Sequence, residues 1–331
     1  VAEVAKPIEV ESGAIEVTIS AGVAVQAPPR PADNLEGAAR KLMHRADLAM
    51  YHSKKEGRNR YCWFDKSMEE EARIRREMES AIRAGLARGE FVPHYEQQID
   101  LETGKLVGFE MLARWNSPEM GTVSPEIFIP VAESCGLIGP LSQSLIASAL
   151  RDAKSWDPSL TLSVNISSMQ LRDPWFPQKL LKLLLSSDFP AARLDVEISE
   201  SCLHENLTAV QTMIVSLKNI GVRVSLDDFG TGFASLTQLR TLPFDRVKID
   251  RSFVQGAAQG SSESLAIVRA VVAMAHSLEM KTTAEGVESE EEARLVRTMG
   301  CDRIQGFYFG RPMSSDDARS LFQTDYRELR A

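Results

Sequence analysis

The sequence has 331 residues, of which 44% are hydrophobic and 25% are charged, and its formal net charge is −8 at pH 7. This composition is ordinary for a globular protein with more than one domain. The net negative charge argues against a DNA partner. The sequence contains no run of about eighteen apolar residues, so it does not predict a membrane span. The four cysteines lack the spacing of zinc ligands or of a disulfide framework, so we expect a cytoplasmic protein, and a membrane anchor upstream of the first residue is left open.

The N-terminal segment contains few predicted elements. Residues 15–25 alternate and are rich in β-branched side chains, which predicts a strand, and residues 35–55 carry the apolar stripe of a helix. These two elements cannot bury a core alone, so they either complete a domain that begins upstream or pack on the C-terminal remainder of the chain. Residues 69–88 predict a connecting amphipathic helix. A helix that docks one stripe is favoured over a dimerising coiled coil, because the stripe is too short for several heptads.

From residue 91 onward, strand-like and helix-like segments alternate. Helices are predicted between the strands at residues 127–135, 141–156, 175–186, 206–219, 262–278 and 290–299. The predicted strands cover residues 91–99, 106–115, 160–166, 193–198, 223–226, 246–249, 281–283 and 303–309. This alternation over roughly 240 residues predicts an α/β fold, a TIM-like (β/α)8 barrel. Only residues 100–105 join the first two strands. A parallel crossover needs about a dozen residues, so the first strand should run antiparallel to its neighbour.

Polar side chains recur at the C-terminal ends of the predicted strands, which meet at one mouth in such a barrel. They are Glu110, Asn165, Glu197, Asp227, Asp228, Lys248, Asp250, Glu285 and Gln305. Carboxylates gathered there would repel one another by about 4 kcal/mol per pair at about 4 Å, so either their pKa values rise or cations lie among them. Oxygen ligands without Cys or His nearby favour Mg²⁺, Mn²⁺ or Ca²⁺ over zinc. Adjacent aspartates suit two ions, an arrangement that serves in-line attack on a phosphodiester.

Other features of this mouth each allow more than one interpretation. Lys248 near cations should have a lowered pKa and orient or deprotonate an attacking water, or it is a structural partner of a nearby aspartate. Gly230 and Gly232 either let the backbone approach a phosphate or act as hinges. Arg114 is favoured as a phosphate-binding fork over a partner for the acidic cluster.

The same positions carry a resemblance to a known family. Over about residues 91–322 the sequence resembles EAL domains, a family of cyclic-di-GMP phosphodiesterases. The signature Glu-Ala-Leu appears as Glu110-Met111-Leu112, and NIS, EISES, DDFGTGFASL, KIDRSFV, AEGVE and QGFYFGRPM follow in order. The resemblance implies hydrolysis of cyclic di-GMP to linear pGpG in bacterial second-messenger signalling. We expect two Mg²⁺ or Mn²⁺ ions per site and inhibition by Ca²⁺, whose flexible geometry positions water poorly.

Residue by residue, the resemblance implies a role for each position of the mouth. The metal ligands would be Glu110, Asn165, Glu197, Asp227, Asp228 and Glu285. Lys248 would lie beside the attacking water with Gln305 nearby, and Glu200 would hold the loop after the two aspartates. The substrate would be bound by Arg114 at a phosphate, by Asp250 on the guanine side, and by Glu96, Leu112, Gly286 and Pro312.

The sequence departs from the family pattern at two positions. Met111 replaces the signature alanine, at a position where the family varies and whose side chain should point away from the metals. Glu96 replaces the glutamine of the family's Tyr-Gln-Pro, a residue that normally helps to hold the nucleotide. This second change bears on substrate affinity rather than on metal binding.

The N-terminal segment resembles the C-terminal part of a GGDEF domain, the diguanylate-cyclase family. EVTISAGVAV followed by ADLAMYHSKKEGRNRY matches the last core strand and helix of that family, whereas the Gly-Gly-Asp-Glu-Phe loop is absent, so no cyclase activity is expected. We therefore expect a GGDEF-like remnant at residues 1–66, a connecting helix at 67–89 and an EAL-type barrel at 90–331. A homodimer through the barrel is an expectation from the family alone.

Two alternatives stand beside an active phosphodiesterase. A catalytically inactive receptor for cyclic di-GMP would be expected to lack metal ligands or the lysine, and all of them are present here. An unrelated barrel lyase or isomerase with a metal and a lysine base would leave the glycine-rich loop unexplained. The completeness of the site favours the active hydrolase.

Overall fold

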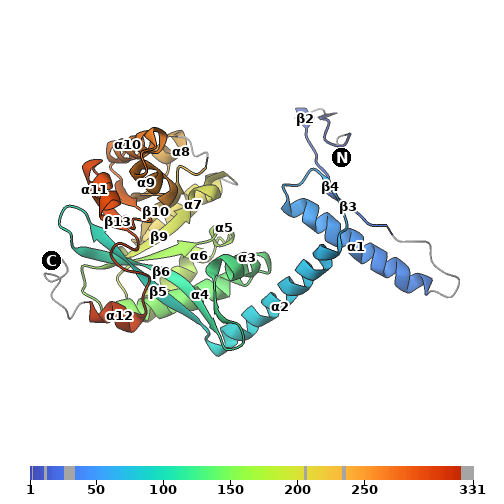
Figure 1. Cartoon of the computed structure of the whole chain (residues 1–331), viewed down its shortest axis with the longest axis horizontal. Helices are drawn as coiled ribbons and strands as arrows, with labels where there is room; N and C mark the ends of the chain where they lie inside the picture. Colours follow the sequence, from blue (N-terminus) through green and yellow to red (C-terminus); the bar gives the residue numbers. More distant parts are fainter. Residues whose placement is uncertain (2, 11–12, 26–33, 205–206, 233–235, 322–331) are drawn as a thin grey trace. The chain divides into compact units, whose positions relative to one another are not determined.

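The chain divides into two units, Val1–Ala81 and Ile82–Ala331. The computed structural model describes all residues except 2, 11–12, 26–33, 205–206, 233–235 and 322–331 (Figure 1). Helix α2 (Lys66–Arg88) begins in the first unit and ends in the second, and it corresponds to the helix predicted at residues 69–88. None of the described helices combines the length and hydrophobicity that a membrane crossing requires.

The first unit is built around helix α1 (Leu35–Lys55), as predicted. Asn34 caps the helix by accepting a hydrogen bond from the Gly37 N–H at 3.1 Å. Strand β3 (Ala21–Val23) pairs in parallel with β4 (Tyr61–Trp63) and packs on α1. Gly22 permits this packing, because a Cβ there would lie 1.9 Å from a carbonyl oxygen of α1.

The predicted strand at residues 15–25 is wrong over most of its length. Residues 21–23 form β3, and Ile15 ends a separate antiparallel hairpin of β1 (Ile8–Val10) and β2 (Gly13–Ile15). The intervening residues are mostly exposed and pair with no strand in the described part of the chain. Alternating β-branched residues fit a strand surface, but they do not supply the neighbouring strand that completes its hydrogen bonds.

The second unit is a closed barrel of eight strands (Figure 1), which confirms the predicted fold. Around the barrel the strands follow in the order β5 (Phe91–Asp100), β13 (Arg303–Gln305), β12 (Lys281–Ala284), β11 (Arg246–Ile249), β10 (Arg223–Phe229), β9 (Leu194–Ser199), β8 (Thr161–Ile166) and β6 (Leu106–Ser117). Pairing of β5 with β6 closes the ring, and β5 is antiparallel to both of its neighbours, as predicted. The short β7 (Gly121–Val123) extends β6 as an antiparallel hairpin.

Helices surround the strands of this unit (Figure 1). The six predicted helices correspond to α3 (Pro125–Ser134), α4 (Ile138–Ala153), α6 (Phe176–Ser187), α7 (Leu207–Ile220), α10 (Ser262–Ser277) and α11 (Glu290–Thr298). The sequence prediction missed α5 (Ser168–Leu171), α8 (Leu236–Thr241), α9 (Arg251–Ala258), α12 (Ser315–Ser320) and the 3-10 turns η1 (Ala191–Arg193) and η2 (Glu200–His204). These elements are too short for the hydrophobic period of a helix to be visible.

The barrel interior is polar, and the apolar core lies between the strands and the helices. Along β9, the apolar Leu194, Val196 and Ile198 alternate with Asp195 and Glu197, and all five are buried. Successive side chains of a strand point to opposite faces. The two acids point inward, since each forms an ion pair with a residue of β11, which lies two strands away beyond β10.

The last strand is shorter than predicted. We expected a strand at residues 303–309, but β13 ends at Gln305. Gly306 follows with a φ of 149°, and a Cβ there would lie 2.3 Å from the backbone nitrogen of Val287. Only glycine permits this close approach, which turns the chain away from the barrel.

Candidate active site

Lys248 and the acids of the predicted mouth come together in the structure. The Lys248 side chain is buried, and its Nζ lies 2.6 Å from both Glu197 Oε2 and Glu285 Oε1. The same nitrogen lies 3.1 Å from Glu110 Oε2 and 3.3 Å from Asp227 Oδ1. One ammonium therefore pairs with four carboxylates, which come from β6, β9, β10 and the segment after β12. Glu110 is the exception to the strand-end prediction, because β6 continues beyond it to Ser117.

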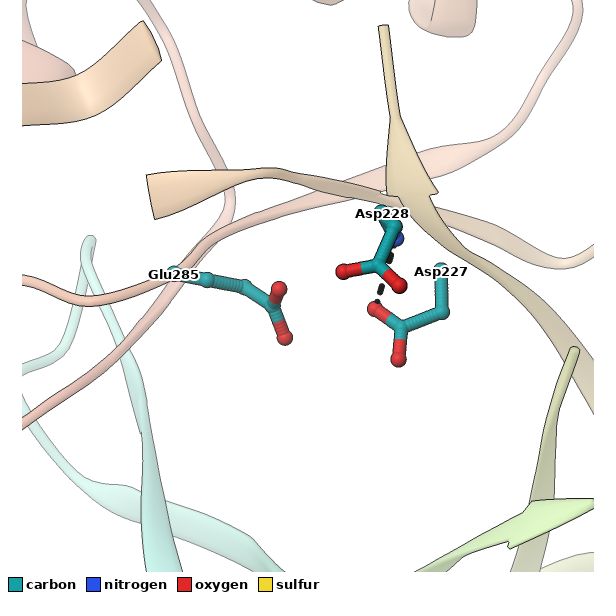
Figure 2. Close-up of side chains that lie close together, drawn as sticks. All are labelled: Asp227, Asp228 and Glu285. Carbon is teal, nitrogen blue, oxygen red and sulfur yellow. Dashed lines mark hydrogen bonds between the residues drawn. The ribbon is translucent and has the colours of Figure 1, made fainter. Parts of the chain in front are cut away.

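Asp227, Asp228 and Glu285 gather at the same mouth (Figure 2). One carboxylate oxygen from each lies within 4.8 Å of the others, and Figure 2 shows Glu285 extending toward the two adjacent aspartates. Asp228 adopts the left-handed conformation, with a φ of 55°, and its N–H donates to Asp227 Oδ1 at 2.9 Å. Aspartate tolerates this conformation better than most residues. The arrangement leaves three carboxylates in position to share a cation.

Amide side chains hold the carboxylate of Glu110. Asn165 Nδ2 donates to Glu110 Oε1 at 2.5 Å, and Gln305 Nε2 donates to Glu110 Oε2 at 2.5 Å. Gln305 Nε2 also donates to Glu96 Oε2 at 2.6 Å. Gln98, which the sequence prediction missed, donates from Nε2 to Gln305 Oε1 at 3.3 Å. The sequence did contain a signal for Gln98, because it lies two residues after Glu96 and therefore on the same face of β5.

Burial and mutual repulsion raise the pKa values of several acids of the mouth. Burial raises the pKa of Glu197 and of Glu285 well above the usual carboxyl range, and neighbouring acids add to this effect. Burial, followed by the charges of Asp227 and Asp250, raises the pKa of Asp228 to about 6. The sequence prediction was that crowded carboxylates have raised pKa values or take up cations, and these acids show the first effect.

The pKa values of Glu110 and Lys248 shift in the sense that favours their charged forms. For Glu110, burial acts to raise the pKa, but Lys248 and the amides of Gln305 and Asn165 outweigh it. For Lys248, burial acts to lower the pKa, but the surrounding carboxylates raise it well above its usual value. We expected a lowered pKa from neighbouring cations; the protein's own groups have the opposite effect on Lys248.

The chemistry of the mouth fits a divalent metal ion. Glu197 Oε1 is buried and has no hydrogen-bond partner among the described residues. A buried carboxylate oxygen without a partner is unfavourable. Lys248 supplies one positive charge, whereas five carboxylates line the site: Glu110, Glu197, Asp227, Asp228 and Glu285. Hard oxygen donors of this kind are the ligands that Mg²⁺, Mn²⁺ and Ca²⁺ prefer.

Glu200 fixes the start of the loop that follows the two aspartates. Its Oε2 accepts hydrogen bonds from the N–H groups of Gly230 at 2.9 Å and Gly232 at 3.0 Å. Gly230 has a φ of 101°, and a Cβ at Gly232 would lie 2.9 Å from the Glu200 carboxyl carbon. The two glycines are therefore required for this contact. Residues 233–235 of the DDFGTGFASL motif lie outside the described residues.

Arg114 lies on β6 beyond Glu110, where it is half-buried. Its Nη1 donates to the carbonyl of Ala113 at 2.9 Å. Burial lowers the pKa of Arg114, and the nearby charge of Glu96 acts in the opposite direction. Glu96 therefore places a carboxylate within electrostatic reach of the predicted phosphate-binding arginine. A glutamine at this position would not do so.

The remaining predicted substrate contacts differ in how they relate to the acidic cluster: the charge of Asp250 acts on Asp228, and Gly286 is the chain neighbour of Glu285. Asp250 caps α9, and its Oδ1 accepts the Ser252 N–H at 2.9 Å, so one oxygen is already engaged. Leu112 faces His94 in the β5–β6 ladder, and His94 Nδ1 lies 3.4 Å from the Pro312 carbonyl oxygen. Gly286, with a φ of 62°, directly follows Glu285. Within the described part of the chain, no hydrogen bond or ion pair joins Leu112, Gly286 or Pro312 to the five carboxylates.

Fold and site together define a TIM-like barrel whose mouth offers carboxylate oxygens to a cation. The family model of the EAL domain matches residues 79–312, so the chain belongs to the EAL domain family. It is 34% identical over 321 residues to the bifunctional diguanylate cyclase/cyclic di-GMP phosphodiesterase MucR of Pseudomonas aeruginosa, covering 96% of this chain and 46% of that protein. It is 36% identical over 305 residues to the cyclic di-GMP phosphodiesterase PdeR of Escherichia coli, covering 91% and 45%.

A solved structure has the same fold. The PaMucR phosphodiesterase in complex with c-di-GMP superposes with a TM-score of 0.71 at 33% identity, covering 73% of this chain and 99% of that chain. The chain spans less than half of the length of the curated relatives that it matches.

Proposed function

We propose that this chain is a cyclic-di-GMP phosphodiesterase that hydrolyses its substrate to linear pGpG. The observation that carries the proposal is the ring of carboxylates around Lys248, in which one oxygen of Glu197 has no partner in the part of the chain that the structure describes. Membership of the EAL domain family supports it, as do the activities named for the relatives MucR and PdeR. The complex of PaMucR with c-di-GMP supports the choice of substrate.

The proposed metal centre contains two Mg²⁺ or Mn²⁺ ions. The residues that would hold them are Glu110, Asn165, Glu197, Asp227, Asp228 and Glu285. Asn165 would use Oδ1, because its Nδ2 already donates to Glu110. When bound, such ions polarise a phosphoryl oxygen and make water a stronger nucleophile. Ca²⁺ should occupy the site without supporting turnover, because its flexible geometry positions water poorly.

The chain's own residues would position the reactants. Lys248 Nζ lies among four carboxylates that keep it charged, and it orients the attacking water by donating a hydrogen bond to it. Gln305, held by Gln98, fixes Glu110 at the centre of the site. Arg114 binds a substrate phosphate through its guanidinium fork. Glu200 fixes the backbone after the aspartates, so that their carboxylates stay aimed at the mouth.

The test is a product assay. Purified protein is incubated with cyclic di-GMP in the presence of Mg²⁺, Mn²⁺ or Ca²⁺, or without metal, and anion-exchange chromatography separates the nucleotides. Mg²⁺ and Mn²⁺ should each yield pGpG, whereas Glu110→Ala, Asp227→Asn and Lys248→Ala should abolish it. Glu263→Gln, which removes an exposed acid on α10, is the matched control and should retain activity.

Two outcomes would contradict the proposal. Wild-type protein that binds cyclic di-GMP but yields no pGpG with either metal would be a receptor instead of an enzyme. Strong turnover in Ca²⁺ alone would contradict the proposed metal dependence.

For the N-terminal segment, we propose a GGDEF-like remnant at residues 1–66, with a connecting helix at 67–89 ahead of the EAL-type barrel at 90–331. The packing of β3 on α1 through Gly22 supports this origin, as does the match to bifunctional MucR over 96% of the chain. Superposition on a diguanylate-cyclase domain should align β3 and α1 with its last core strand and helix. A different strand order there would contradict the assignment.

Dimerisation through the barrel stays a prediction, and light scattering of the purified protein measures it.

A further inference from the structure

Below the mouth, the barrel interior holds a second polar layer that takes no part in the proposed reaction. Arg246, two residues before Lys248 on β11, donates from Nη1 to Asp195 Oδ2 at 2.9 Å. Ser225 Oγ donates to Asp195 Oδ1 at 2.7 Å. The exposed fraction of the side chain is 5% for Arg246 and 1% for Asp195. Both oxygens of this buried carboxylate are therefore engaged.

Arg303 lies in the same layer as this ion pair. Asp195 on β9 pairs with Arg223 on β10, and the residue two positions further along β10, Ser225, pairs with Arg246 on β11, which is a displacement of two residues. The same displacement relates the two arginines: Arg246 pairs with Lys281 on β12, and Thr283, two positions further along, pairs with Arg303 on β13. Alternate strands of such a barrel contribute the side chains of one layer. Because the first displacement brings Asp195 and Arg246 into contact, the second directs Arg303 toward Arg246.

This layer contains more positive than negative charge. Burial lowers the pKa of Arg303 to about 10, and the charges of Arg246 and Arg223 add to this, while Asp195 and Asp100 act in the opposite direction. Arg303 is thus charged at neutral pH. Among the groups that act most strongly on Arg303, the guanidiniums of Arg246 and Arg223 stand against the carboxylates of Asp195 and Asp100, so that with Arg303 itself three positive charges meet two negative ones. A buried charge without a partner is strongly unfavourable.

Three hydrogen-bond donors in and beside this layer are unused. Arg246 Nε, Arg303 Nη1 and Thr283 Oγ1 are buried and have no partner among the described residues. Thr283 lies on β12 between the strands of the two arginines, directly opposite Arg303 in the ladder, and is fully buried. Buried donors are almost always paired, with protein or with a bound species. Gln98 Oε1 is also without a partner, and as an acceptor it suits a water molecule.

We propose that a small monovalent anion of the chloride class binds inside the barrel, between Arg246 and Arg303, with the Thr283 hydroxyl as a further donor. One negative charge would balance the one excess positive charge among these groups. An anion accepts hydrogen bonds, and the three donors without partners can supply them. Arg303 is only partly buried, so the anion reaches its site from the N-terminal end of the barrel. Thr283 pairs with Lys248 on one side and with Arg303 on the other, so the anion site borders the proposed metal centre, and its bound anion stabilises the fold.

Bromide substitution tests the location of the anion directly. Bromide replaces chloride and scatters anomalously, so crystals of the whole chain soaked in sodium bromide should show an anomalous peak within hydrogen-bond distance of Arg246 Nε and Arg303 Nη1. The wild-type protein suffices for this measurement. An ordered water at that position, with bromide only at the protein surface, would overturn the proposal.

Thermal unfolding tests whether the anion stabilises the barrel. At constant ionic strength, replacing gluconate by chloride should raise the Tm of the wild-type protein by about 3 °C. Arg303→Met should lose this difference. Lys281→Met, which removes an exposed positive charge at the same end of the barrel, should keep it. A Tm that is equal in both salts would contradict anion binding, and if Arg303→Met does not fold, the wild-type bromide peak decides the question.

Discussion

The two ends of the barrel interior hold buried charges in opposite excess. At the mouth, several carboxylates surround the single ammonium of Lys248, whereas one layer below, Arg246 and Arg303 accompany Asp195. The same strands build both ends: β9 carries Glu197 above Asp195, and β11 carries Lys248 above Arg246. A two-residue step along a strand therefore changes the sign of the uncompensated charge. Under the two proposals above, a divalent cation would balance the charge at the mouth and a small anion would balance the charge of the lower layer.

The largest effect should follow from Lys248→Met, which removes the only ammonium that contacts the acids of the mouth within the described residues. Turnover of cyclic di-GMP should fall about 10³-fold, because the attacking water loses the group that orients it. Without metal, the Tm should fall by about 10 °C, because a partner of buried charges is removed. Added Mg²⁺ should restore more of the Tm than it adds to wild type, since the cation takes over the pairing of the acids.

Lys281→Met is the control for this experiment, because it removes an exposed lysine from the start of β12. Its turnover should stay within about threefold of wild type, well inside the range of a surface substitution. A Lys248→Met protein that kept more than about a tenth of the wild-type turnover would remove Lys248 from the reaction centre.

The second largest effect concerns the lower layer. Arg246→Met leaves the buried Asp195 without its ion-pair partner at 2.9 Å, and should destabilise the protein by about 3 kcal/mol. The double variant with Asp195→Asn should recover part of this loss, because position 195 then carries no unpaired charge. Urea unfolding measures both effects. Turnover and Mg²⁺ affinity per folded molecule should be unchanged. A tenfold change in Mg²⁺ affinity would show that the two ends are energetically coupled.

Much of the mouth could be predicted from the sequence, whereas the lower layer could not. Acids that follow runs such as LDV and VSL are visible as polar residues at the ends of apolar strands, and parallel strands must bring those ends together. Arg246 and Arg303 are the first residues of their strands, where an arginine is usually solvated. Only the pairing of the strands in the folded barrel shows that their side chains point inward. Asp250 caps α9, and this role was not visible in the sequence because α9 is too short to show the hydrophobic period of a helix.

A smaller effect is expected at the mouth, from the substitution of Glu96. Glu96→Gln removes a carboxylate that lies near Arg114 and accepts from Gln305, so Arg114 becomes a better partner for a substrate phosphate. The KM for cyclic di-GMP should fall about tenfold, equivalent to about 1.4 kcal/mol, with kcat nearly unchanged. Steady-state kinetics measures both values. Glu102→Gln, in the exposed turn after β5, is the charge-matched control. An unchanged or raised KM would show that Glu96 does not compete for Arg114.

The smallest effect lies at the lower end, where Asp302 joins the starts of β12 and β13. Burial acts to raise the pKa of Asp302, but hydrogen bonds from Lys281, Thr282 and His276 lower it to about 2. A carboxyl whose pKa is lower in the folded state stabilises the fold above its unfolded pKa, and this contribution disappears as the pH falls from about 4 to about 2. Asp302→Asn should therefore reduce the free energy of unfolding at pH 7 by about 1 kcal/mol, after allowance for solvent screening. At pH 2 the difference from wild type should be much smaller. Urea unfolding at both pH values measures it, with the exposed Asp316→Asn as control. An equal loss at both pH values would mean that Asp302 acts through packing, and that charge pairing at this end of the barrel is confined to the buried layer.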